Sequence, residues 1–522
     1  MHDSTHPTRV TCSRRARLLA VALLLSVSGI LVSGCAGSSS SRAAGTSRIV
    51  YDCVLTKSCY APRQYRVAYG IQPLLDRGID GRGETVTVVD PYPSLNAPAG
   101  SPSRKRGQDR DRRRQMAPAV TDIRQDLKAF DSEFRLPTAR IEVVTSLVGS
   151  ASPWQAEGEE VLDTEVVHTV APGATLRVVL LPSDVLSSAA NATADLLAGL
   201  RLAVSDTDVV SVSGSLGEHY FSRAQLAEMR FILLGAAAHH VTVDASSGDS
   251  GTSSDPWWDM PVKEVSLPAS DPLVLGVGGT SLTANRLTGA YISETGWSTV
   301  GAASGGGFSH LYARPDYQDG VPGISKMRGV PDVAGAAMWS IPVVFTRGGK
   351  EYILGIGGTS ASAPLWGGLM ALADQYAHHS LGFVNPAIYR VGRSSSYHKA
   401  FHDITTGNNT VTISPATFTG YKGASATFTG YQAAPGWDPV TGWGSPNAQV
   451  LVPLLARLSR QTAQRQKPEF TGPSKIRISA MTCGYYRTSS PVAARPMIMR
   501  WISDVPSKIV KLVEVRPVSA GR

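Results

Sequence analysis

A glycine-rich segment followed by an apolar run carries the residue best suited to act as a nucleophile. Residues 355–364 read Gly-Ile-Gly-Gly-Thr-Ser-Ala-Ser-Ala-Pro, and residues 365–372 are apolar. The glycines permit a sharp turn, and the apolar run predicts a helix with Pro364 in its first turn. Ser360 would then lie at a helix N-terminus, where free N–H groups stabilise negative charge on a reacting oxygen. The alternative is a turn in which Ser360 only caps the helix.

Two acidic residues upstream have the spacing of a paired general base. Glu159 and Asp163 are four residues apart within the acidic segment 157–167, and a helix brings such residues to one face. In a cleft of low dielectric the two carboxyl groups would share a proton, and one pKa would rise. The alternative is a solvated acidic helix face, which the further glutamates nearby favour: Glu157, Glu160 and Glu165.

A third carboxyl group follows a predicted buried strand at 241–245. Asp249 lies in the sequence Ser-Ser-Gly-Asp-Ser-Gly, residues 246–251. Loops at the carboxyl ends of parallel strands are the usual place for chemistry in open α/β sheets. A protonated aspartate there can donate a hydrogen bond to the oxyanion of a tetrahedral intermediate. The alternative is a common Gly-Asp-Ser-Gly turn.

The elements that must position these residues alternate between two kinds. Short β-branched runs predict buried strands at Val86–Val89, Ile141–Thr145, Leu176–Leu181, Val209–Ser213, Val241–Ala245 and Leu273–Val277. Helical patterns lie between them near Asp122–Phe134, Glu159–Val170, Ser187–Val204 and Ser222–His239. This alternation predicts an α/β fold with a doubly wound, mostly parallel sheet and helices on both faces.

Together these motifs resemble the sedolisin, or serine-carboxyl, peptidase family. The similarity extends from Tyr65 to Pro446 and includes Ser-Gly-Gly-Gly-Phe-Ser at 304–309 and Arg-Gly-Val-Pro-Asp-Val at 328–333. The resemblance implies a subtilisin-like fold. The residues that match the catalytic positions of the family are Ser360 as nucleophile, Glu159 as base, Asp163 as its partner carboxyl and Asp249 as the oxyanion acid.

The resemblance implies that the chain hydrolyses peptide bonds at acidic pH through an acyl-enzyme, as an endopeptidase or a tripeptidyl-peptidase. Proteins or peptides would be its substrates. One alternative is a histidine-dependent subtilisin relative, but the His-Gly-Thr segment of that family is missing and His168 stands in Val-His-Thr-Val. The other is an inactive lipoprotein that only binds peptides, and the intact set of four catalytic residues argues against it.

The resemblance also implies one structural calcium ion near the end of the domain. Its ligands would be the carboxylates of Asp403 and Asp438 and the backbone carbonyls of Ile404, Ala434 and Gly436. Calcium prefers such oxygen ligands. The alternative is a pair of turns in which each aspartate bonds its own backbone.

The N-terminus has the pattern of an export signal. Basic residues at 14–17 precede an apolar run at 18–32, as in secretory signals. Val-Ser-Gly-Cys at 32–35 resembles a bacterial lipobox, which implies cleavage after residue 34 and lipidation of Cys35. Lipidation predicts a membrane anchor on the outer face of the bacterial cytoplasmic membrane, and the alternative is ordinary secretion. Outside the cytosol, a disulfide between Cys53 and Cys59 is plausible.

We divide the chain into a signal peptide (1–34), a lipidated linker (35–60), a peptidase domain (61–456) with an inserted basic loop (93–118), and a basic tail (457–522). The linker is too short for the pro-region that sedolisins carry, so we expect that device to be lacking. The net charge of +9 is concentrated in the leader, the inserted loop and the tail. The charge therefore does not indicate a nucleic-acid partner.

Overall fold

The computed structural model describes residues 49–91, 122–147, 159–182, 188–254, 261–338, 341–347, 350–416 and 423–465. The predicted signal peptide, the lipidation site Cys35, the inserted loop 93–118 and the tail beyond residue 465 lie outside these residues.

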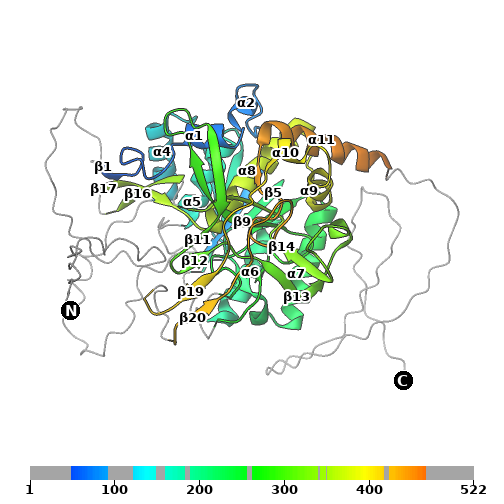
Figure 1. Ribbon diagram of the computed structural model, residues 1–522. Helices are drawn as coiled ribbons and strands as arrows, with labels where there is room; N and C mark the ends of the chain where they lie inside the picture. The colour runs from blue at the N-terminus through cyan, green and yellow to red at the C-terminus, as the bar shows by residue number, and fades with distance from the viewer. Residues whose placement is uncertain are drawn as a thin grey trace, which may run out of the picture. The chain divides into compact units, whose positions relative to one another are not determined.

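A mostly parallel sheet organises the described chain, as predicted (Figure 1). Its strand order is β10-β9-β7-β5-β2-β4-β3, with β15 also paired to β9, and within it only β10 is antiparallel to its neighbour. The strands are β2 (Thr85–Pro91), β3 (Arg140–Val144), β4 (Thr175–Leu181), β5 (Val209–Val212), β7 (Thr242–Ser246), β9 (Leu275–Ala284), β10 (Tyr291–Gly296) and β15 (Val333–Ala336).

Helices cover both faces of this sheet, which explains why its strands are apolar on both sides. On β2, Val88 packs in the core with α5 (Glu159–Val170), α8 (Thr359–Ala377) and α11 (Ala448–Arg465), while Val89 packs with α6 (Ala189–Ala203) and α7 (Arg223–Ala238). The other helices are α1 (Pro62–Ala68), α2 (Gln72–Leu75), α4 (Ile123–Phe134), α9 (Asn385–Gly392), α10 (Tyr397–Ala400), and the short 3-10 helices Glu218–Tyr220 and Asp316–Gln318. The predicted subtilisin-like α/β class is therefore confirmed.

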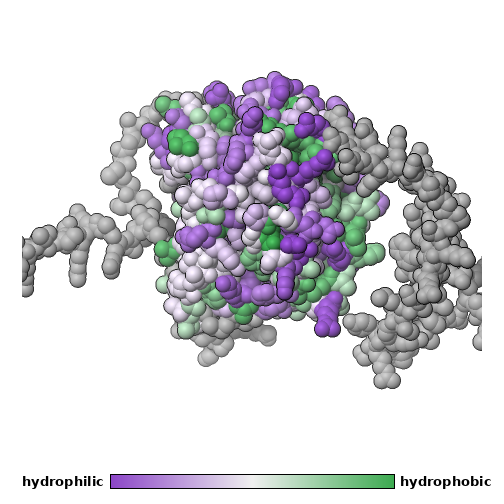
Figure 2. Space-filling model, turned by 45° about the vertical axis from the view of Figure 1, so that its right-hand side comes forward, coloured by the Kyte–Doolittle hydropathy of each residue, from purple (hydrophilic) through white to green (hydrophobic). Residues whose placement is uncertain are grey.

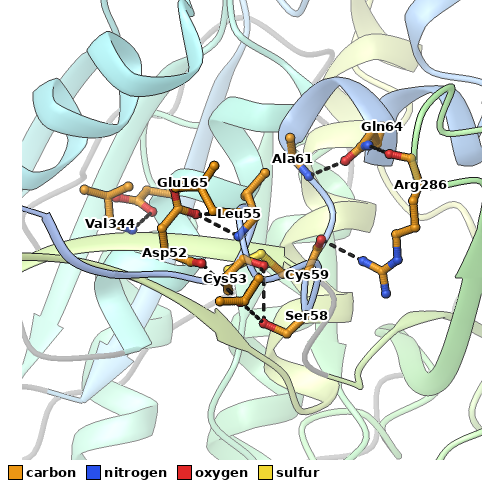
Figure 3. Close-up of a disulfide and its surroundings, with 12 residues drawn as sticks. Asp52, Cys53, Leu55, Ser58, Cys59, Ala61, Gln64, Glu165, Arg286 and Val344 are labelled. Atoms are coloured by element: carbon orange, nitrogen blue, oxygen red, sulfur yellow. Dashed lines mark hydrogen bonds between the residues drawn. A yellow bond between two sulfur atoms is a disulfide. The ribbon is translucent and has the colours of Figure 1, made fainter. Parts of the chain in front are cut away.

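A second, three-stranded sheet has the order β1-β17-β16, with bounds Ile49–Asp52, Lys350–Ile356 and Ile341–Arg347. Directly after β1, Cys53 and Cys59 form the predicted disulfide (Figure 3). Both cysteines are buried in a small cluster with Phe130, Val344 and Ile353. The prediction of a linker through residue 60 was thus wrong at its C-terminal end, because apolar burial makes residues 49–60 part of the folded domain.

The remaining strands form short pairs around the main sheet. They are β6 (Leu216–Gly217) with β8 (Ser266–Leu267), β11 (Ser298–Thr299) with β12 (Ala302–Ala303), β13 (Gly307–Ala313) with β14 (Met327–Val330), β18 (Phe401–His402) with β21 (Ser445–Pro446), and β19 (Val411–Ile413) with β20 (Ala426–Phe428). Helix α11 continues to Arg465, so the predicted domain end at residue 456 falls inside a helix.

Hydrophilic and apolar residues are interspersed on the surface that Figure 2 shows. Phe231 and Leu234 are exposed together on α7, and the other large apolar side chains that are exposed come from separate segments: Leu55, Val262, Leu287, Ile292, Val300 and Leu311. Within the described ranges, no helix has the length and hydropathy needed to cross a bilayer.

Candidate active site

Ser360 is the second residue of α8, at the end of a short connection from β17. Gly358 caps the helix with φ +101°, a conformation that glycine adopts readily. A Cβ at this position would lie 2.6 Å from Asp249 Oδ2, so the turn also needs glycine for space. Ser360 is half-buried, and its Oγ donates to the Ser213 carbonyl over 3.3 Å. The hydroxyl therefore lies at a helix N-terminus, as predicted.

We predicted that Pro364 lies in the first turn of α8. It lies further inside the helix instead. Proline lacks the N–H group that would bond the carbonyl four residues earlier, and here that carbonyl belongs to Ser360. The Ser213 Oγ lies 3.2 Å from the Ser360 carbonyl, but its single proton is given to the nearer Asp163 Oδ2 over 2.6 Å. Ser213, directly after β5, thus lies beside the first turn of α8.

Asp249 is held against the residue that precedes Ser360. Its Oδ1 accepts hydrogen bonds from the Thr359 backbone N–H and from the Thr359 hydroxyl, both over 2.8 Å. Burial raises the pKa of Asp249, and the two bonds from Thr359 oppose that rise. A carboxyl group that keeps its proton at this position can donate it to an oxyanion formed at Ser360.

Glu159 begins α5 and lies beside the nucleophile. The pKa of Glu159 is raised to about 8, mainly because the carboxyl group is buried. The charges of Asp90 and Asp249 add to this rise, and a hydrogen bond with Ser360 opposes it. Since the Ser360 hydroxyl is within reach of a carboxylate, the arrangement suits proton transfer to Glu159.

Asp163 lies behind Glu159 and is fully buried. Its Oδ2 accepts a hydrogen bond from the Ser213 hydroxyl over 2.6 Å. Burial raises the pKa of Asp163 well above its usual range, and the charges of Asp90 and Glu159 add to this effect. The structure thus places the other three predicted catalytic residues, Glu159, Asp163 and Asp249, in the neighbourhood of Ser360.

A fourth carboxyl group, Asp90, was missed by the sequence analysis. It is fully buried near the end of β2, and burial raises its pKa to about 7 while a hydrogen bond with Asp163 lowers it. The available signal was an aspartate closing a buried parallel strand, where open α/β sheets place their sites. Asp90, Asp163 and Glu159 form a group of interacting acids that titrate together.

His168, the histidine of the alternative mechanism, points elsewhere. Its Nε2 lies 3.0 Å from Asp131 Oδ1 and 2.8 Å from the Pro137 carbonyl. Among the described residues, no hydrogen bond joins a histidine to Ser360.

The predicted calcium ligands lie on adjoining loops. Asp403 accepts a hydrogen bond from the Gly436 N–H over 3.1 Å, and buried Asp438 accepts one from the Ala434 N–H over 3.2 Å. The carbonyls of Ile404, Ala434 and Gly436 accept no hydrogen bond from the described part of the chain. Two carboxylates and three open carbonyls fit the oxygen chemistry of calcium, although no cluster of three or more His, Cys, Asp or Glu ligands occurs within the described residues.

Comparison with known proteins finds serine peptidases, while no family model matches. Kumamolisin of Bacillus sp. (strain MN-32) is 35% identical over 330 residues, which are 61% of this chain and 53% of kumamolisin. Sedolisin of Pseudomonas sp. (strain 101) is 33% identical over 345 residues, 62% of this chain and 54% of sedolisin. Human tripeptidyl-peptidase 1 is 30% identical over 273 residues, 47% of this chain and 43% of that protein.

The chain thus spans about half the length of the curated relatives that it matches. Among solved structures, Pseudomonas sedolisin, a serine-carboxyl proteinase complexed with pseudo-iodotyrostatin, superposes with a TM-score of 0.57 at 26% identity. That match covers 80% of this chain and 99% of the sedolisin chain.

Proposed function

We propose that this chain belongs to the sedolisin family and is a serine-carboxyl peptidase that hydrolyses peptide bonds in proteins or peptides. One observation carries the proposal. The Ser360 hydroxyl lies near enough to Glu159 to lower the pKa of that carboxyl group, and Thr359, the residue directly before Ser360, is hydrogen-bonded to Asp249. A base and an acid therefore flank a single nucleophilic oxygen.

In the first half of the reaction, Ser360 Oγ attacks the carbonyl carbon of the scissile bond while Glu159 takes the hydroxyl proton. Protonated Asp249 donates a hydrogen bond to the resulting oxyanion. When the carbon–nitrogen bond breaks, Glu159 gives its proton to the leaving amine, and the acyl group stays on Ser360 as an ester. A water molecule then attacks the ester and gives a proton to Glu159, which returns it to Ser360 as the acid product leaves.

Asp163 and Asp90 would control which carboxyl group carries the negative charge. Glu159, Asp163 and Asp90 share their raised pKa values as one coupled group, and the reaction needs the state in which Glu159 carries the charge while the other two hold protons. Asp249 must keep its proton, and its raised pKa supports this at acidic pH. We therefore expect activity on the acidic side of neutrality.

The test is an assay of the purified chain on an unfolded protein substrate from about pH 3 to about pH 8, the range in which carboxyl groups and histidine titrate. Ser360→Ala and Glu159→Gln are assayed alongside. We expect cleavage that is strongest at acidic pH and lost in both variants. No cleavage at any pH would favour the inactive peptide-binding alternative. Activity that survives Glu159→Gln and rises towards neutral pH would favour a histidine base.

We also propose one structural calcium ion held by the carboxylates of Asp403 and Asp438 and the carbonyls of Ile404, Ala434 and Gly436. The two hydrogen-bonded carboxylates and the three carbonyls without a described donor support this site. The ion would cross-link the loops before β19 and before β21 and has no part in the reaction.

Finally, we propose that the chain is exported and is anchored to the membrane through a lipid on Cys35. The signal-like N-terminus supports export. The disulfide between Cys53 and Cys59 also supports it, because such bonds persist outside the reducing cytosol.

A further inference from the structure

The β16–β17 hairpin delivers the nucleophile to the site. Strand β17 ends at Ile356, and the two glycines of the connection lead directly into α8 and Ser360. The position of the hairpin relative to α5 therefore affects the position of the Ser360 hydroxyl relative to Glu159.

Besides apolar packing, a buried hydrogen bond joins α5 to the hairpin. The Val344 backbone N–H on β16 donates to Glu165 Oε2 on α5 over 2.8 Å, and Glu165 is fully buried (Figure 3). Val344 faces Ile353 across the hairpin, and the Ile353 carbonyl accepts the Cys53 N–H over 2.9 Å. Hydrogen bonds thus connect, one after another, the disulfide segment, β17, β16 and α5.

The same edge of β16 has a second, closely similar contact. The Thr346 N–H, two residues along the strand, donates to Asp126 Oδ1 on α4 over 3.0 Å. Both carboxyl groups are fully buried. They satisfy backbone donors that would otherwise be exposed at the edge of the sheet. The two contacts differ in one respect that matters here: α5 carries Glu159 and Asp163, whereas α4 carries none of the proposed catalytic residues.

Glu165 lies on the side of α5 away from the reacting groups. Successive residues of an α-helix are rotated by about 100°, so Glu165 is about 200° around the helix from Asp163. One face of α5 thus presents Asp163 to Ser213, and the other is bonded to the strand that leads to Ser360. The helix also packs directly on α8, where Val170 contacts Gly368, and the bond from Glu165 adds a polar contact to the hairpin on another face of α5.

We propose that Glu165 is a positioning residue, which holds α5 against the β16–β17 hairpin and so keeps Glu159 within proton-transfer distance of Ser360. This inference rests on the proposed peptidase function. Proton transfer between side chains requires heavy atoms about 2.6–3.2 Å apart, and a displacement of about 1 Å can lower the rate about 100-fold. A helix held less firmly in this direction would therefore slow the chemical step without removing any reacting group.

The test compares Glu165→Ala with Asp126→Ala, because each removes one buried carboxyl group from the same strand edge. We expect Glu165→Ala to lower kcat by about tenfold or more while KM changes by less than about twofold. Asp126→Ala should leave kcat within about twofold of the wild type. Thermal unfolding of both variants measures the structural cost that they share.

Two further variants keep the test decisive if Glu165→Ala does not fold. Glu165→Gln keeps an oxygen acceptor for Val344, and burial raises the pKa of Glu165 so far that a neutral side chain is a close substitute. We expect kcat to be restored. Glu165→Asp keeps the carboxyl group but withdraws it by one methylene, and we expect kcat to fall.

Three results would overturn the inference: equal losses of kcat in Glu165→Ala and Asp126→Ala, a loss carried by KM alone, or no rescue by Glu165→Gln. A wild-type chain that cleaves nothing contradicts the proposed function instead, so the two failures are distinguishable.

Discussion

The Ser213 hydroxyl donates a hydrogen bond to Asp163 Oδ2 over 2.6 Å, and both side chains are buried. This bond stabilises the charged form of the carboxyl group and lowers the pKa of Asp163 against the larger effect of burial. The Ser213 carbonyl meanwhile accepts the Ser360 hydroxyl and the Ser246 hydroxyl, the latter over 2.6 Å. One residue of the β5 loop thus contacts both the nucleophile and the partner of the base.

The substitution Ser213→Ala should therefore alter the titration of the site. Without the donor, the pKa of Asp163 rises further, because hydrogen bonding to a charged form favours that form. Because Asp163 titrates together with Glu159, we expect the limb on which kcat rises with pH to move to higher pH. The pH profile of kcat is the measurement. Ser246→Ala, which removes a donor from the same carbonyl but does not touch Asp163, is the control and should leave the profile in place.

Asp90→Asn should shift the same profile in the opposite direction. The charge of Asp90 raises the pKa of Asp163 and of Glu159. A neutral amide removes that repulsion, so the pKa of Glu159 should fall and the limb on which activity rises with pH should move to lower pH. Asp244→Asn is the matched control, since Asp244 is equally buried but bonds Ser211. If both variants gave the wild-type profile, Asp90 would have no part in the coupled group.

Stability should decrease as the pH rises from acid to neutral. Burial raises the pKa of many carboxyl groups in the folded state, including Asp163, Glu165, Asp244 and Asp374. In the unfolded chain these groups titrate near pH 4, so above that pH the folded state binds more protons than the unfolded state. The free energy of unfolding is therefore highest below about pH 4. It falls as the pH rises from there to the raised pKa values of the folded state.

Thermal unfolding at about pH 4.5 and about pH 8 tests this expectation, and Tm should be lower at the higher pH. Asp374→Asn removes one of the buried groups outside the active site and should reduce the difference. A Tm that stayed level or increased towards pH 8 would contradict it.

Removal of calcium should destabilise the domain. An ion that binds only the folded state adds about 2.7 kcal/mol when its free concentration is 100 times its dissociation constant. We expect a chelator to lower Tm and added calcium to restore it. Asp438→Asn should abolish the response to calcium. Asp76→Asn, which changes an aspartate at the end of α2, is the control and should retain it. An equal response in both variants would place the ion elsewhere.

Cys35→Ser should convert the chain to a form without a lipid anchor. In the proposed lipoprotein the Cys35 thiol would be the attachment point of the acyl chains, each of whose buried methylenes contributes about 0.8 kcal/mol of membrane affinity. Phase partition with a detergent that clouds on warming is the measurement. We expect wild-type protein from bacterial cells in the detergent phase and the variant in water. Wild-type protein that partitions into water would argue for ordinary secretion.

The amino-acid sequence determined the features that depend on neighbours along the chain. The glycine turn before Ser360 and the four-residue spacing of Glu159 and Asp163 are local, because helix geometry alone brings residues i and i+4 to one face. The alternation of apolar strands and helices likewise predicted the parallel sheet. The 35–60 linker and the position of Pro364 in α8 were misjudged, because burial and the first residue of a helix depend on tertiary packing.

Only the tertiary structure decided which distant groups meet. Asp90 contacts Asp163, Ser213 lies between Asp163 and Ser360, and Glu165 bonds a strand far along the chain. The same acidic residues could have formed a solvated helix face. Their chemistry follows from burial, because a carboxyl group removed from water gains a raised pKa that its sequence neighbours do not reveal.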